Sequence, residues 1–153
     1  MEVDVTPEEK IAELGLTLPE APKPVAAYVP AVRTGDLVFV SGQGPFGMDL
    51  RGQVGSAVTI EQAQEAARVT CLNGLAVIKG EVGELSKVKR IVKLTVYVAS
   101  APGFGDQPQV ANGASELLEQ IFGEAGRHAR AAVGVAELPF GIPVEIEFVA
   151  EVA

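Results

Sequence analysis

The last quarter of the chain reads Arg130-Ala-Ala-Val-Gly-Val-Ala-Glu-Leu-Pro139 and, after three intervening residues, Pro143-Val-Glu-Ile-Glu-Phe148. Both runs predict β-strands, because β-branched residues recur in them and a glycine- and proline-containing turn separates them. Alternate residues of a strand face the same side. The second strand therefore has one apolar face, and its other face carries two carboxylates, Glu145 and Glu147. An arginine near such a face suggests a site for a small molecule that bears a carboxylate.

The composition predicts one folded domain without a nucleic-acid groove. The chain has 153 residues, of which 48% are hydrophobic and 21% charged, which is enough for a single domain with its own core. The formal net charge of -8 argues against a groove built on bulk positive charge. We therefore expect no nucleic-acid partner.

The cysteine content, the first residues and the length of the apolar runs together predict the cellular compartment. Cys71 is the one cysteine, so an intramolecular disulfide is excluded and a reducing compartment is indicated. The acidic start, residues 1–5, differs from the basic and then apolar pattern of a signal peptide. No apolar run approaches roughly 18 residues, the length that spans a membrane. We expect a cytoplasmic protein without a membrane segment.

Capping and periodicity predict the order of the elements. A short helix begins after Thr6, with Glu9 as the capping-box partner, and ends at Gly15. A second helix begins after Thr59, with Gln62 as its partner. The remaining expected elements are a proline-rich connector to residue 25, strands at 28–33 and 37–41, a strand at 88–98, a helix from about 107, and strands at 130–135 and 144–148.

This order predicts a two-layer α+β domain in which two helices pack on one face of a mixed β-sheet. Residues 1–25 form an N-terminal helix and connector, and residues 26–153 form the domain itself. The second face of the sheet lacks a cover within the chain. It either faces water or lines an interface between subunits, which would suit its small residues.

The last two strands are expected to pair as an antiparallel hairpin, with Ala131, Val133 and Val135 on the face of Val144. Arg130 and Glu145 would then share the opposite face, roughly 13 Å apart along the ladder. That separation is too long for an ion pair and leaves room for a small molecule. An arginine fork can grip a carboxylate, and a glutamate can move a proton. The alternative is that both are ordinary exposed strand residues.

Several motifs in the right order resemble the YjgF/RidA family of reactive intermediate deaminases, over about residues 25–153. The sequence carries Tyr28 before the first strand, Gly35-Asp-Leu-Val-Phe-Val-Ser-Gly-Gln43, and Asn112 on the second long helix. It also carries Arg130 with Val133-Gly-Val-Ala-Glu-Leu-Pro139, and Val144-Glu-Ile-Glu147. The N-terminal helix is extra to the compact form and is similar to the longer branch of the family.

The resemblance implies a chorismate-mutase-like fold and a homotrimer with clefts between subunits. It implies hydrolysis of a 2-imino or 2-enamino acid to a 2-keto acid and ammonia, without a metal or an organic cofactor. It also implies a role for each matching residue: Arg130 as the carboxylate anchor, Glu145 as the group that handles water or proton, and Tyr28, Gly42, Asn112 and the backbone of Ala132 as substrate contacts.

Two positions depart from the family pattern. Ala131 and Ala132 stand where active members usually have serine or threonine and then often cysteine. They favour an alternative, a trimeric protein that binds a small carboxylate metabolite without turnover. A third hypothesis, the endoribonuclease or translation-inhibitor role attached to the family, agrees poorly with the negative charge. His128, the only histidine, is expected in a loop, and Cys71 in the core.

Overall fold

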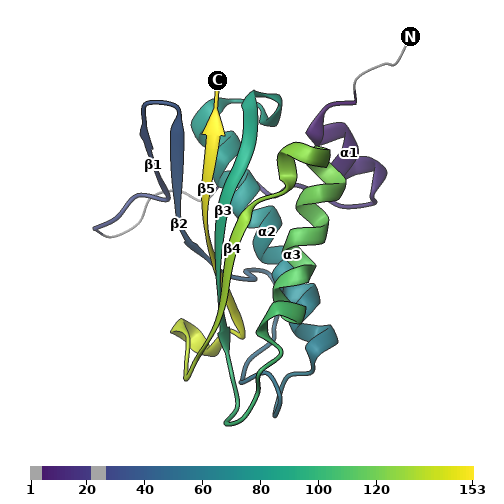
Figure 1. Ribbon diagram of the computed structural model, residues 1–153, viewed down its shortest axis with the longest axis vertical. Helices are drawn as coiled ribbons and strands as arrows, with labels where there is room; N and C mark the ends of the chain where they lie inside the picture. The colour runs from purple at the N-terminus through teal and green to yellow at the C-terminus, as the bar shows by residue number, and fades with distance from the viewer. Residues whose placement is uncertain (1–4, 22–26) are drawn as a thin grey trace.

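The computed structural model describes residues 5–21 and 27–153, and it has two layers (Figure 1). One layer is a five-stranded sheet, and α2 (Ile60–Val82) and α3 (Gln107–Phe122) form the other. The strands are β1 (Ala31–Thr34), β2 (Leu37–Gln43), β3 (Val88–Ala99), β4 (Ala129–Val135) and β5 (Val144–Val152). A short helix, α1 (Pro7–Glu13), precedes them, and single 3-10 turns occupy η1 (Leu85–Lys87), η2 (Gly123–Gly126) and η3 (Pro139–Gly141). The predicted α+β class and element order are confirmed.

The helix starts confirm the local predictions. The Thr6 hydroxyl accepts from the Glu9 amide, and the Glu9 carboxylate accepts from the Thr6 amide, which closes the capping box of α1. The same pair of bonds joins Thr59 and Gln62 at the start of α2. These caps satisfy amide groups that a helix leaves without internal partners.

The predicted hairpin between the last two strands is wrong. The sheet order is β1-β2-β5-β3-β4, so β3 lies between β4 and β5. β4 runs parallel to β3, and β5 runs antiparallel to it. β5 is central because every helix-facing residue from Val144 to Val152 is buried and apolar. β4 offers a charged residue and two small residues on that side, which suits the edge of a sheet.

The predicted faces of β4 are also reversed. Leu94 of β3 has Arg130 as its partner on one side and Phe148 on the other, so Arg130 shares the helix-facing side. Tyr97 has Val133 and Glu145 as its partners, so Glu145 lies on the opposite face. Arg130 and Glu145 therefore face opposite sides of the sheet within one chain.

Close packing at the end of β4 explains the reversal. A Cβ on Gly134 would come within 2.7 Å of Gln107 Nε2 and 3.0 Å of Ser100 Oγ, so the helix-facing side accepts only small residues there. The valines of β4 lie on the open side instead. Valines at alternate positions of a strand usually face the core, but the alternate valines of β4 lie on the face that the helices do not cover.

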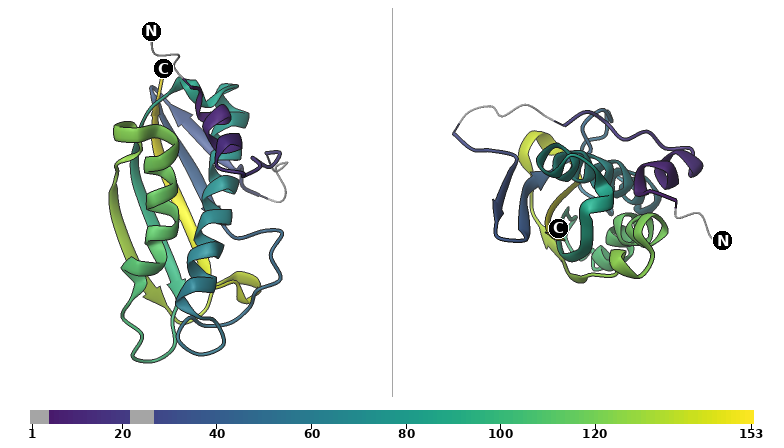
Figure 2. Two further views of the ribbon diagram at one scale, coloured as in Figure 1. Left: turned by 90° about the vertical axis from the view of Figure 1, so that its right-hand side faces the viewer. Right: turned by 90° about the horizontal axis from the view of Figure 1, so that it is seen from above.

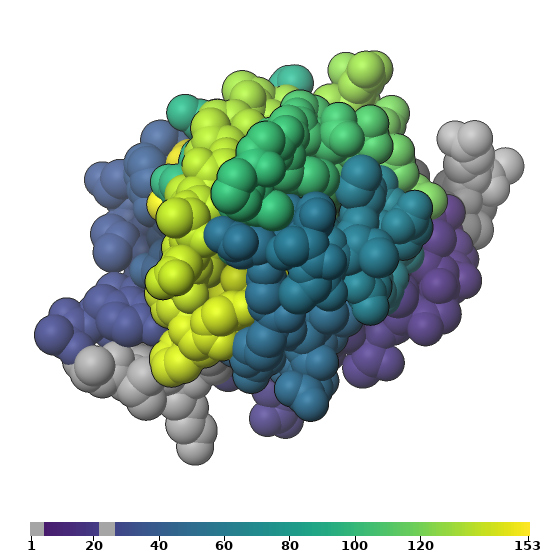
Figure 3. All heavy atoms as spheres, turned by 90° about the horizontal axis from the view of Figure 1, so that it is seen from below, coloured from purple at the N-terminus to yellow at the C-terminus, as the bar shows by residue number. Residues whose placement is uncertain are grey.

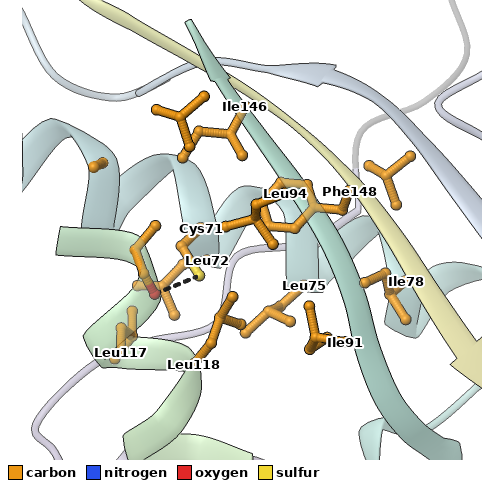
Figure 4. Packing of buried hydrophobic residues seen from close by; sticks show 14 of the residues in the cluster. Cys71, Leu72, Leu75, Ile78, Ile91, Leu94, Leu117, Leu118, Ile146 and Phe148 are labelled. Carbon is orange, nitrogen blue, oxygen red and sulfur yellow. Dashed lines mark hydrogen bonds between the residues drawn. The ribbon is translucent and has the colours of Figure 1, made fainter. Parts of the chain in front are cut away.

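The core fills the space between the sheet and the two long helices (Figure 4). The Phe148 ring lies beside Leu94, and Phe148 is 2% exposed. The ring packs directly on Gly74 of α2, where an added Cβ would overlap it. Cys71 is fully buried in the same cluster, and burial raises the pKa of its thiol to about 12. The prediction that Cys71 lies in the core is confirmed.

Helices cover one face of the sheet among the described residues, and the other face is open (Figure 2). Side chains on the open face include Val32, Phe39 and Val133, which are 55%, 44% and 43% exposed. The same face also carries Lys93, Glu145 and Glu147. A surface of this kind is typical of a contact with another molecule.

The N-terminal helix packs on the helical layer. Ile11 of α1 is 2% exposed, and the Glu8 carboxylate lies 3.4 Å from Lys79 Nζ and accepts from the Leu85 amide. This helix therefore does not cover the open face of the sheet (Figure 2). Within residues 5–21 and 27–153, no helix combines the length and the apolar character that a membrane crossing needs.

The loop between β4 and β5 is held against the loop between β2 and α2. Gln53 Nε2 donates to the Ala136 carbonyl, and the Gly52 amide donates to the Gly141 carbonyl, each at 2.9 Å. Figure 3 shows these segments side by side, one in yellow and the other in blue. These contacts hold in place the loop that connects the edge strand β4 to the central strand β5.

Candidate functional site

Arg130 is held at the edge of the sheet by two side chains of α3. Its Nη1 donates to Asn112 Oδ1 at 2.8 Å and to Ser115 Oγ at 3.1 Å. Asn112 and Ser115 are three residues apart on a helix, so they present their side chains on one face. The structure thus brings together Arg130 and Asn112, both of which the sequence singled out. The guanidinium has further N–H groups beyond Nη1, and these can grip an anion.

Ser115 is a contact that the sequence analysis missed, and it joins Arg130 to His128. His128 Nδ1 lies 2.7 Å from the Gly126 carbonyl, and His128 Nε2 lies 2.9 Å from Ser115 Oγ. A carbonyl only accepts, so Nδ1 carries the proton and Nε2 of the neutral ring accepts from the Ser115 hydroxyl. His128 does lie in a loop, as predicted, immediately before β4.

The surroundings of His128 favour its neutral form. Burial lowers the pKa of the imidazole below its ordinary value, and the positive charge of Arg130 lowers it further, while the hydrogen bond to Gly126 acts in the opposite direction. The Ser115 hydroxyl therefore has a stable acceptor, and its own oxygen remains free to accept from Arg130.

A hollow of about 250 Å³ opens beside this cluster. Its lining combines polar and charged side chains: Asn112, Ser115, Glu116, Glu119, Arg127, His128 and Arg130. The volume lies below the range of sites for drug-sized ligands, so it suits a molecule of amino-acid size.

Glu145 and Gly42 form a second cluster, on the open face. A Cβ on Gly42 would lie 2.9 Å from Glu145 Cδ, so the glycine lets the carboxylate rest against β2. Partial burial raises the pKa of Glu145 above its ordinary value, and the neighbouring Glu147 carboxylate raises it further. Glu147 in turn accepts from the Tyr97 hydroxyl at 3.0 Å. A glutamate in this state holds its proton at higher pH than an exposed one.

The remaining predicted residues lie near one or the other cluster. Ala132 shares the helix-facing side of β4 with Arg130 and packs on the core. Tyr28 is 58% exposed and precedes β1. Its neighbours are tied to β2, since Ser41 Oγ donates to the Val29 carbonyl at 2.8 Å. The predicted set thus divides between an Arg130 cluster and a Glu145 cluster. The Arg130 cluster holds the predicted Arg130, Asn112 and Ala132, joined by Ser115 and His128, which were not predicted as site residues. The Glu145 cluster holds Glu145 and Gly42, with Tyr28 on the approach to β2.

Comparisons with known proteins place the chain among relatives along nearly its whole length. A model of the family described as Endoribonuclease L-PSP matches residues 18–152. Protein TCP17 of Trypanosoma cruzi is 46% identical over 145 residues, which cover 92% of this chain and 91% of that protein. A protein from Dermatophagoides farinae named 2-iminobutanoate/2-iminopropanoate deaminase is 32% identical over 133 residues, covering 86% and 91%.

A solved structure agrees with this placement. The crystal structure of protein Atu1372 from Agrobacterium tumefaciens, of unknown function, superimposes with a TM-score of 0.89 at 44% identity. The superposition covers 96% of this chain and 92% of that one. Every residue of the two clusters lies within the matched range of the family model.

Proposed function

The chain belongs to the Endoribonuclease L-PSP family, the YjgF/RidA family that its sequence resembles, and we propose that it deaminates small 2-imino or 2-enamino acids. The products are a 2-keto acid and ammonia. The observation that carries the proposal is the arginine that α3 holds at the edge of the sheet. Arg130 is fixed through one nitrogen, so its other N–H groups are available to a carboxylate. A named deaminase among the relatives supports the same chemistry.

The reaction needs one carboxylate anchor and one proton carrier. Arg130 binds the substrate carboxylate and orients the neighbouring C=N bond. Water adds to the imine carbon, a proton reaches the nitrogen, and the resulting carbinolamine loses ammonia as the C=O bond forms. Glu145 moves these protons, because its raised pKa lets it hold a proton at higher pH than an exposed glutamate does, and so act as an acid and then as a base.

The two clusters meet in a homotrimer. Arg130 and Glu145 face opposite sides of the sheet within one chain, so a cleft that holds both groups needs two copies. The open face, with Val32, Phe39 and Val133, supplies the apolar contact between copies. Arg130 from one subunit then lies opposite Glu145 from the next. Sedimentation equilibrium at micromolar concentration tests this, and a monomer would overturn it.

An alternative function, from a different class, is a trimer that binds a keto acid or similar carboxylate without turnover. Ala131 and Ala132 favour it, since they replace the hydroxyl and the thiol of active members. Both functions use Arg130 as the anchor, and they differ only in whether Glu145 acts on the ligand. The endoribonuclease name of the family finds little support in a chain with a net charge of -8.

One experiment separates these functions. The purified protein is given 2-iminobutyrate or 2-aminoacrylate, generated enzymatically in the same vessel, and keto-acid release is compared with the uncatalysed rate. An accelerated rate that disappears in Arg130→Ala supports the deaminase. An unchanged rate together with Arg130-dependent keto-acid binding supports the binding protein.

The cytoplasmic location stays a prediction, tested by fractionation of the source cells.

A further inference from the structure

Three hydrogen bonds in series connect the backbone of η2 to the guanidinium of Arg130. The Gly126 carbonyl accepts from His128 Nδ1, His128 Nε2 accepts from the Ser115 hydroxyl, and Ser115 Oγ accepts from Arg130 Nη1. Each donor has one acceptor in the series, and for a neutral ring the carbonyl at its beginning fixes the order of donors and acceptors. The family resemblance names none of these roles for Ser115 or His128.

We propose that Ser115 and His128 are positioning residues that aim Arg130 at the ligand carboxylate, and that they do so best while the imidazole is neutral. The inference rests on the carboxylate site of the proposed function and adds a regulation of that site. The reason is a reversal of hydrogen bonding. When His128 gains a proton, Nε2 becomes a donor and can no longer accept from the Ser115 hydroxyl.

Protonation then reverses the bond at the middle of the series. The Ser115 hydroxyl loses the acceptor of its own proton, and Oγ must accept from the imidazolium as well as from Arg130. The imidazolium also adds a positive charge next to the guanidinium, which repels it. The bond from Arg130 to Asn112 is unaffected, so only one of the two tethers of Arg130 is weakened. The grip on the ligand weakens without disappearing.

The charged groups around His128 come from each element that packs there. Arg130 of β4 and Arg127 of the preceding loop are positive and favour the neutral ring. Glu116 and Glu119 of α3 line the same hollow, but both are exposed, so water screens their charge. Glu124 of η2 lies 3.9 Å from Arg127 and is engaged by it. The carbonyl of Arg127 also accepts from Arg90 of β3.

The first part of the test is ligand binding as a function of pH. Calorimetry with 2-oxobutyrate, the product of the proposed reaction, is run between about pH 5 and pH 8 on the wild type. We expect affinity to fall as pH decreases through the transition of His128. NMR follows that transition directly, because the chain has a single histidine.

Variants then assign the effect. Ser115→Ala and His128→Gln should each weaken binding at pH 8 by about five- to tenfold, the loss of one hydrogen bond. His128→Gln should lose the pH step, and in Ser115→Ala the step should shrink to the part that comes from charge repulsion alone. Ser115→Thr keeps the hydroxyl and should restore most of the affinity. Ser86→Ala, an exposed serine in η1, is the matched control and should behave as the wild type.

A second readout concerns the histidine alone and needs no ligand. Ser115→Ala removes a donor to the neutral ring, and Arg130→Ala removes a positive charge, so each should raise the pKa of His128. A pKa unmoved in both variants would overturn the series. Wild-type affinity in Ser115→Ala, or binding independent of pH, would overturn the positioning role. Absence of 2-oxobutyrate binding at every pH would instead refute the proposed function, and with it the ligand that Arg130 is aimed at.

Discussion

The two faces of the sheet use the same strands in opposite ways. On the face toward the helices, Leu94, Val96 and Ile146 are fully buried, and the chain itself completes their packing. On the open face, Phe39 and Val133 remain more than two-fifths exposed. Folding of the single chain therefore closes one face of the sheet and leaves large apolar side chains exposed on the other.

The same division separates the two parts of the candidate site. The Arg130 cluster lies at the edge of the helix-covered side, where α3 fixes its hydrogen bonds. The Glu145 cluster lies on the open face, where a partner subunit would complete its surroundings. Substitutions on each side should therefore affect different quantities, and the following predictions test whether they do.

The largest effect is expected from Glu145→Gln, on the open face. If this carboxyl moves protons in the reaction, its loss should reduce kcat roughly 10²- to 10⁴-fold. Binding of 2-oxobutyrate should change little, because Arg130 still anchors the carboxylate. Steady-state kinetics and calorimetry measure the two quantities. Glu151→Gln, on the same strand, is the control, and equal kinetics in both variants would contradict a catalytic role for Glu145.

Stability gives Glu145 a second and independent signature. Its pKa is raised in the folded protein, so the folded state binds the proton more tightly than the unfolded chain does. The free energy of unfolding therefore falls as pH rises from the ordinary glutamate range through the raised pKa. Glu145→Gln removes this term. Urea titrations at several pH values should show the variant gaining stability relative to the wild type as pH increases.

The next largest effect is expected from Arg130→Ala, on the helix-covered side of the sheet. Removing a charged hydrogen-bond donor should weaken 2-oxobutyrate binding by about 10- to 150-fold. Arg130→Lys keeps the charge without the planar fork and should fall between the two. The free energy of unfolding should change by no more than about 0.5 kcal/mol, because Arg130 is exposed. Wild-type affinity in Arg130→Ala would exclude it as the anchor.

The features that the sequence predicted correctly are local ones. The capping boxes at Thr6 and Thr59 depend on residues three apart, so they can be recognised without knowledge of the fold. The apolar face of β5 follows from strict alternation. These elements and their order were sufficient to predict the α+β class and the packing of two helices on one face of the sheet.

The errors arose where a distant contact decides the structure. The pairing of β4 with β3 depends on residues more than 30 positions apart, and the spacing within 130–148 favoured a hairpin instead. Ser115 and His128 are 13 positions apart and meet only because α3 packs on the start of β4. No pattern within either segment predicts that contact. The sequence does show that Ser115, three residues after Asn112 on a helix, shares its face and could bind the same partner.

A smaller effect, on stability, is expected from Gly74→Ala, in the helix-covered face. The new Cβ would overlap the buried Phe148 ring, which costs about 1–3 kcal/mol of unfolding free energy. Alanine gains about 1 kcal/mol over glycine within a helix, so the net loss is up to about 2 kcal/mol. Chemical denaturation measures it. Phe148→Leu in the same background should recover part of the loss, and additive effects would contradict a direct contact.

The smallest effect is expected from one substitution made on both faces. Val96→Thr places a hydroxyl in the fully buried layer, where it costs at least about 1 kcal/mol of unfolding free energy. Val133→Thr makes the same change on the open face of the adjacent strand and should alter the stability of the isolated chain by less than about 0.5 kcal/mol. Its effect should appear instead as weaker self-association, measured by sedimentation over a range of concentrations. Equal destabilisation in both variants, without a change in association, would mean that the open face is completed within the chain after all, and the division between the two clusters would lose its physical basis.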